Sequence, residues 1–163
     1  MPRDTGERCT NADELVALAN EAGIPNEQIW LDPIVSPVSV EINQIKACLE
    51  FMSVLGDIAP RCKSIVGISN VSNGTPSHLR PYLNRTLLIM LMIYGLYAAI
   101  IDAFDSELVR IARGQNQKLV ELVRKVMDGE KIQAPAGSEE EKYLKTVKVL
   151  TGASLYSHSW LEI

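Results

Sequence analysis

Apolar residues along the chain follow two alternating patterns, helical spacing and short continuous runs. Continuous runs bounded by turn residues predict buried strands at residues 28–35, 63–69 and 97–103. Helical spacing predicts helices at residues 11–22, 40–55, 82–94, 105–126 and 139–150. Strict alternation with short connections is typical of parallel strands joined by right-handed crossovers. The pattern therefore predicts an α/β fold.

Two helix beginnings carry capping signals. In the first helix, Leu15 and Leu18 recur at helical spacing, and Thr10 or Asn11 is the expected cap. In the last helix, Ser138 is followed three residues later by Glu141, which is the spacing of a capping box. Each signal predicts where its helix begins.

The uncharged stretch Leu87–Ile101 needs its own interpretation because a hydropathy profile reads it as a membrane span. A spanning helix needs roughly 20 apolar residues, whereas this stretch has 15. Gly95 also lies inside it, where a helix would naturally end. We therefore expect a buried helix ending near Gly95, then a buried strand, and no membrane association.

The charge balance argues against nucleic-acid binding. The 163 residues include 16 Lys and Arg against 20 Asp and Glu, a formal net charge of −4, whereas phosphate neutralisation needs a basic face. Apolar residues make up 47% of the chain, which is ordinary for a protein that buries a core. We expect one domain over residues 1–163, with a linker at 128–138 and a C-terminal helix and tail at 139–163.

Cysteine and histidine usage predicts neither disulfides nor a metal site. The cysteines are odd in number and scattered: Cys9, Cys48 and Cys62. We interpret them as reduced thiols of a cytoplasmic protein, since the N-terminus also lacks the apolar stretch of a secretory signal. The two histidines, His78 and His158, lie 80 positions apart. No bound metal is therefore expected.

Polar residues directly follow the three predicted strands. They are Asp32 after the first, Ser69 and Asn70 after the second, and Asp102 after the third. Ligands of parallel α/β proteins bind at the carboxyl ends of strands, so these side chains are candidate ligand contacts on one face. Each also fits a structural role, since Asp-Pro and Asn are common in turns and Asp caps helices. The G-x-S-x-G, G-x-G-x-x-G and P-loop patterns are missing, so serine hydrolysis and nucleotide binding have no signal.

Several short segments, taken in order, match the motif pattern of one known family. They are Ile29–Val38 (IWLDPIVSPV), Val66–Ser72 (VGISNVS), Arg80–Thr86 (RPYLNRT), Ala98–Asp102 (AAIID) and Leu155–Ser159 (LYSHS). Together they resemble the pterin-binding methyltransferases, specifically the methyltetrahydrofolate:corrinoid/iron-sulfur protein methyltransferases. In that family, G-[LI]-S-N-V-S at a strand end leads to R-P-x-[IL]-N-R-T.

The resemblance implies a fold and an activity. The fold is a partial (β/α)8 TIM barrel of the dihydropteroate-synthase-like type, of which this chain holds about the last three to four βα units. The activity is transfer of the N5-methyl group of methyltetrahydrofolate to the cobalt(I) corrinoid of a partner corrinoid/iron-sulfur protein, as in the acetyl-CoA pathway.

The resemblance also implies roles for individual residues. Asn70 would be catalytic, through a hydrogen bond to N5 that tightens as the C–N bond breaks. Asp32 would bind the pyrimidine edge of the pterin. The other residues expected to contact the substrate are Gly67 and Ser69 in the wall, Asn73 and Arg80 on the following loop, and Asp102 at the last strand.

A closed barrel of this type typically needs about 250 residues, and the family's first half has no counterpart here. We expect a complementary N-terminal half-barrel chain, a homodimer, or a longer protein to supply it. Two alternative functions remain open: a non-catalytic pterin-binding or corrinoid-protein-docking remnant, and another pterin-dependent enzyme. Dihydropteroate synthase and the folate domain of methionine synthase are examples of the latter.

Overall fold

The computed structural model describes residues 1–162 and shows a mixed α/β fold. Its sheet has three strands within this range, all parallel and in the spatial order β1-β2-β3. The strands are β1 (Trp30–Leu31), β2 (Lys63–Gly67) and β3 (Ala98–Ile100). The predicted parallel α/β arrangement is confirmed at this level.

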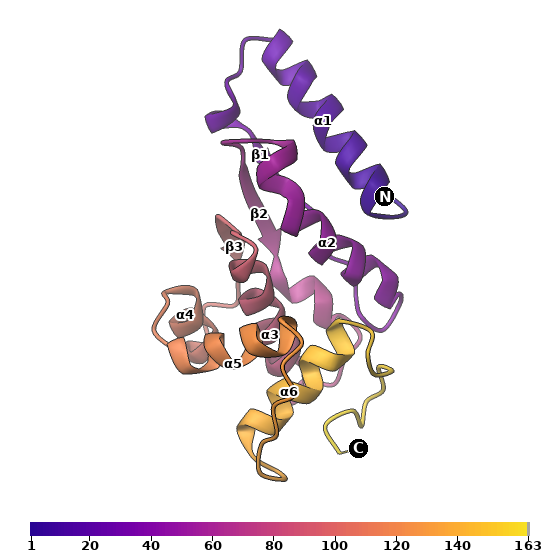
Figure 1. Ribbon diagram of the computed structural model, residues 1–163, viewed down its shortest axis with the longest axis vertical. Coiled ribbons are helices and arrows are strands. Elements are labelled where there is room, and N and C mark those ends of the chain that lie inside the picture. Colours follow the sequence, from indigo (N-terminus) through magenta and orange to yellow (C-terminus); the bar gives the residue numbers. More distant parts are fainter. Residues whose placement is uncertain (163) are drawn as a thin grey trace.

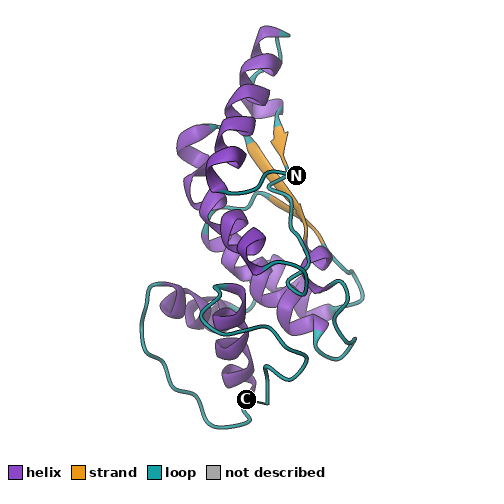
Figure 2. Cartoon of the chain, turned by 90° about the vertical axis from the view of Figure 1, so that its right-hand side faces the viewer, coloured by secondary structure: helices purple, strands orange, loops and turns teal. Residues whose placement is uncertain are grey.

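Helices form most of the remaining structure. Within residues 1–162 they are α1 (Thr5–Glu21), α2 (Ile42–Ile58), α3 (Arg80–Ile93), α4 (Ser106–Ala112), α5 (Gln117–Met127) and α6 (Glu139–Leu150), with short 3-10 helices η1 (Asn26–Gln28) and η2 (Ile68–Ser72). The molecule is elongated, with α1, α2 and the sheet toward one end and α4 to α6 toward the other (Figure 1). Figure 2 shows the strands along one flank of the molecule, with helices on the opposite side.

Two helix predictions are wrong. Helix α1 begins at Thr5, about six residues early, because the Asp4 carboxylate caps it by accepting from the Glu7 backbone N–H at 2.9 Å. The predicted helix 105–126 is two helices, α4 and α5. Gly114 between them has φ +70°, a conformation that breaks a helix, and the Asn116 side chain then caps α5.

The split of the apolar stretch at Gly95 is confirmed. Helix α3 is largely buried and ends at Ile93, and Gly95 follows in the left-handed conformation with φ +83°. No helix within residues 1–162 has the length and hydrophobicity to cross a membrane. The strand that follows is shorter than predicted and is not buried, since the side chain of Ile100 is 65% exposed. Strand β1 is also shorter than predicted, because Pro33 lacks an N–H for the ladder and the chain turns at Ile34.

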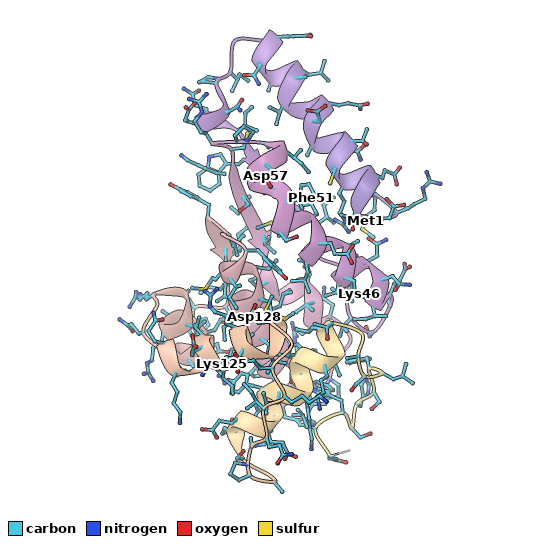
Figure 3. The ribbon with its side chains drawn as sticks, viewed as in Figure 1. Met1, Lys46, Phe51, Asp57, Lys125 and Asp128 are labelled. Atoms are coloured by element: carbon cyan, nitrogen blue, oxygen red, sulfur yellow. The ribbon has the colours of Figure 1, made fainter. Side chains whose placement is uncertain are left out.

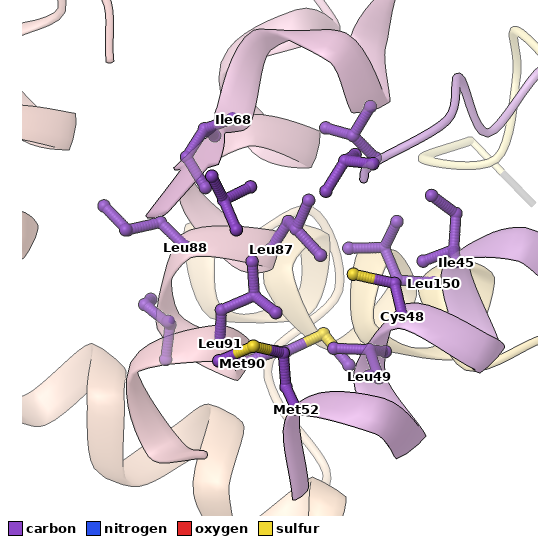
Figure 4. Close-up of a cluster of buried hydrophobic side chains, with 14 of the residues drawn as sticks. Ile45, Cys48, Leu49, Met52, Ile68, Leu87, Leu88, Met90, Leu91 and Leu150 are labelled. Atoms are coloured by element: carbon purple, nitrogen blue, oxygen red, sulfur yellow. The ribbon is translucent and has the colours of Figure 1, made fainter. Parts of the chain in front are cut away.

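The core lies between α2, α3, α6 and one face of the sheet. Figure 3 shows the side chains along the whole ribbon, including buried Phe51 on α2, which packs against α1. In Figure 4, Cys48 and Met52 of α2 lie beside Leu87 and Leu91 of α3, with Leu150 of α6 close by. Each fully buried aliphatic side chain of this kind contributes roughly 1.5–3 kcal/mol to folding.

Candidate functional site

One face of the sheet has no cover within residues 1–162. Strand register pairs Trp30 with Lys63 and Gly67 with Ile100, so these residues share that face. Their neighbours on the opposite face, such as Val66, are buried against the helices. Ile100 is 65% and Trp30 46% exposed, and Figure 2 shows no helix over this flank. We call this face, with its exposed apolar side chains, the open face.

Two of the strand-end residues, Asp32 and Asp102, are staggered along the open face. Ser69 and Asn70 instead lie in the 3-10 helix η2, since β2 ends at Gly67 and not at residue 69 as predicted. Asp32 and Asp102 stand two residues beyond Trp30 and Ile100, and both are exposed, as the period of two requires. If the pairing of β1 with β2 is continued by one residue, Asp32 lies beside Ile65 of β2. On the other side of β2, Ile100 of β3 pairs with Gly67, the last residue of β2. Asp32 therefore lies on the order of 6–7 Å before the end of β2 along the strand direction, and Asp102 lies beyond that end.

Asp32 sits in a strained turn. Its Oδ1 accepts a hydrogen bond from the Ile34 backbone N–H at 2.8 Å. Ile34 has φ +59°, which is rare for a β-branched residue and costs energy unless neighbouring groups hold it. The second oxygen of Asp32 accepts no hydrogen bond from any residue in the range 1–162, so it is free to bind a ligand.

The group that holds this turn is Arg8, which sequence analysis missed. Its guanidinium is buried and donates to the carbonyl oxygens of Pro33 and Ile34, and to the Gln44 side chain at 2.7 Å. The only signal for it is spacing: Arg8 precedes Ala12 and Val16 by four and eight residues, and these three form the buried face of α1. Leu15 and Leu18, which suggested the helix, are exposed instead.

At the end of β2, Gly67 and Asn70 are close neighbours. A Cβ atom on Gly67 would lie 3.4 Å from the amide nitrogen of Asn70, an ordinary van der Waals contact, so the two residues are direct neighbours. The Asn70 amide is exposed and takes part in none of the hydrogen bonds among residues 1–162. Ser69 is exposed beside it, and its carbonyl accepts from the buried Ser72 hydroxyl at 3.2 Å.

The loop after η2 is held on several sides. Asn73 is exposed, and its carbonyl accepts from the Ser39 hydroxyl at 3.0 Å. Arg80 is half-buried, and its Nε donates to the Ser72 hydroxyl at 3.1 Å. The Thr75 and Tyr156 hydroxyls are 2.7 Å apart, which joins the loop to the C-terminal tail. Arg80 therefore stabilises the Ser69–Asn70 segment indirectly, because the Ser72 hydroxyl that it contacts donates to the Ser69 carbonyl.

Asp102 makes the same kind of hydrogen bond as Asp32, without the positive φ found at Ile34. Its Oδ1 accepts from the Phe104 backbone N–H at 2.9 Å, and its other oxygen has no partner in residues 1–162. Asp105 caps the following helix, α4, by accepting a hydrogen bond from the Leu108 backbone N–H. Its carboxylate also accepts hydrogen bonds from Arg85, from Nη2 at 2.7 Å and from Nε at 3.1 Å. Burial is the largest single influence and would raise the pKa of Asp105, but the Arg85 hydrogen bonds and charge, together with the backbone N–H groups of Leu108 and Glu107, lower it on balance.

The arrangement offers hydrogen-bonding groups and no metal centre. Within residues 1–162, no group of three or more His, Cys, Asp or Glu side chains is placed to hold a metal ion. Asp32 and Asp102 each have one carboxylate oxygen that can accept a hydrogen bond from a ligand N–H group. The side-chain amide of Asn70 can both donate and accept. No protein-family model matches this chain.

Proposed function

We propose that this chain forms the carboxyl-terminal part of a dihydropteroate-synthase-like (β/α)8 barrel that binds methyltetrahydrofolate. The proposed activity is transfer of its N5-methyl group to the corrinoid of a corrinoid/iron-sulfur protein. The observation that carries the proposal is the exposed, unengaged Asn70 amide beside Gly67 at the carboxyl end of β2. That position is where parallel α/β proteins bind their ligands.

Substrate binding follows from the groups that are free. The unpartnered oxygens of Asp32 and Asp102 would accept hydrogen bonds from N–H groups of the pterin. Gly67 and Ser69 would form the wall, and Asn73 would lie at its margin. Arg80 would act through Ser72 rather than through contact with the ligand.

The chemistry explains why an amide stands at the site. When the N5–methyl bond breaks, its electron pair stays on N5, which becomes a better leaving group if it is hydrogen bonded or protonated. The Asn70 amide would supply a hydrogen bond that strengthens in the transition state. The corrinoid, bound to the partner protein, supplies the cobalt(I) nucleophile that takes the methyl group.

Exposed apolar residues on the open face support a further partner chain. On the open face Ile100 is 65% exposed, and Phe104, in the turn after β3, is 98% exposed. Within residues 1–162, β1 and β3 each have one edge with no strand beside it. Exposed edges and apolar patches are normally covered in native assemblies. A complementary half-barrel chain or a second copy of this chain would cover them and supply the remaining contacts to the pterin.

The small number of polar groups on this face favours a second candidate, a non-catalytic pterin-binding or corrinoid-protein-docking remnant. Isothermal calorimetry with methyltetrahydrofolate, paired with light scattering on the same sample, tests pterin binding. Binding supports the proposal, and a corrinoid methyl-transfer assay then separates the enzyme from the remnant. If the assembled protein shows no binding at millimolar ligand, both pterin hypotheses are wrong.

A further inference from the structure

A second candidate site lies away from the open face. An open-sided cavity of about 640 Å³ is lined by α4, α5, α6, residues 128–138 and Arg85 of α3, and none of the strand-end residues lines it. Small-molecule sites usually have volumes of roughly 300–1,000 Å³. In Figure 3, Lys125 on α5 marks the helix that forms one wall.

The inner part of this cavity is apolar. Leu119 and the ring of Tyr143 are buried, and Leu122 and Ile132 are half-buried. These four residues form what we call the apolar floor. A ligand that reaches it must bring hydrocarbon to displace water favourably.

The polar groups next to the floor are already engaged. Arg85 donates to Asp105 and, at 3.5 Å, to the Tyr143 hydroxyl. Glu107 accepts from Asn116 at 2.5 Å and from Arg110 at 3.0 Å. These inner groups therefore leave little capacity to bind a polar ligand.

The rim of the cavity carries excess negative charge. Its charged side chains are Lys118, Lys125, Glu121, Glu130, Glu139 and Glu140. Lys118 pairs with Glu140 at 3.1 Å and Lys125 with Glu121 at 3.7 Å. Glu139 pairs outside the lining, with Lys142 at 2.6 Å. Glu130 forms no ion pair within residues 1–162, so its carboxylate is the free charge at the rim.

We propose that this cavity binds a small hydrophobic amine. Its hydrocarbon body would contact the apolar floor, and its ammonium group would lie at the rim beside Glu130. This inference is independent of the proposed pterin chemistry, since the two sites share no residue.

A matched ligand series tests the proposal. We would titrate the whole chain with 4-phenylbutylamine, 4-phenylbutanol and 4-phenylbutanoate, using protein NMR with the methyl signals of Leu119, Leu122 and Ile132. The amine should bind about two- to fivefold more tightly than the alcohol, the range of an exposed ion pair, and the carboxylate should bind most weakly. Added salt should narrow these differences. Equal binding of all three, or no binding at millimolar concentration, overturns the proposal.

Two variants separate charge from shape. Glu130→Gln should remove the preference for the amine while binding of the alcohol stays unchanged, and its exposed position makes loss of the fold unexpected. Glu14→Gln, exposed on α1, is the matched control and should change neither. An undiminished amine preference in Glu130→Gln would refute the assigned charge contact.

Discussion

The buried guanidinium of Arg8 donates to the carbonyl of Ile34 at 3.2 Å, and the Ile34 N–H in turn donates to Asp32 at 2.8 Å. A side chain of the first helix thus fixes the strained turn that presents a candidate ligand-binding carboxylate. Arg8 is buried and Asp32 is exposed, so a buried side chain holds in place a carboxylate that solvent can reach.

Arg8→Lys should weaken this turn even though it keeps the charge. An ammonium group lacks the planar fork of donors that reaches both carbonyls and Gln44, so one or more buried acceptors lose their partner, at about 1–3 kcal/mol. Urea denaturation should show that loss, and the Ile34 amide should exchange faster with solvent. Arg3→Lys, at an exposed ion pair, is the control and should change stability by less than about 0.5 kcal/mol. Unchanged exchange at Ile34 would mean that Arg8 does not hold the turn.

If the proposed methyltransferase function is right, Asn70→Ala should separate chemistry from binding in the assembled protein. If the amide donates mainly in the transition state, methyl transfer should fall by about 100-fold or more, as when one oxyanion-hole donor is removed. The dissociation constant for methyltetrahydrofolate should change far less. Asn43→Ala, exposed on α2, is the matched control. Equal losses in rate and binding would show that Asn70 only positions the ligand.

Asp105 should make stability depend on pH in the acidic range. Its pKa is lowered from an ordinary value of 3.8 in the folded protein, so its contribution is complete above that pH and is lost as the pH falls through the lower folded value. Asp105→Asn should reduce stability at neutral pH by about 1–3 kcal/mol and flatten the acid-side decline. Denaturation midpoints from neutral to acidic pH measure both effects. Asp57→Asn, at an exposed carboxylate, should follow the wild-type profile.

Ser138→Ala should destabilise the last helix. The Ser138 hydroxyl accepts from the Glu141 N–H at 3.1 Å, while the Glu141 carboxylate accepts from the Gly137 N–H at 2.7 Å. Loss of the cap should cost about 0.5–2 kcal/mol in thermal or urea unfolding. Ser154→Ala, in the exposed segment after α6, should be neutral. A neutral Ser138 variant would contradict the capping role.

The open face should cause association that one charge can disrupt. Ile100→Lys places an ammonium group in the exposed apolar patch and should shift the protein toward monomer in light scattering. Leu155→Lys, at an exposed apolar residue in the tail, tests whether added charge alone has this effect. A wild-type chain that stays monomeric at high concentration would contradict this prediction.

Local chemistry made much of the secondary structure predictable. The end of α3 near Gly95 and the Ser138 cap follow from single residues whose conformational or hydrogen-bonding preferences act within one helical turn. The parallel sheet follows from alternation of strands and helices. Helix α1 begins earlier than predicted because Asp4 caps it and the helix continues through Thr10 and Asn11.

What the sequence determined by itself is therefore the alternation of helices with three strands and the positions of the polar residues that follow each strand. The tertiary structure alone decided that Arg8 turns inward while Leu15 and Leu18 face solvent, and that register staggers Asp32 against Asp102. It also decided that β3 remains exposed. The physical reason is range: caps and turns depend on neighbours within a few residues, whereas burial and register depend on contacts between segments far apart in the chain.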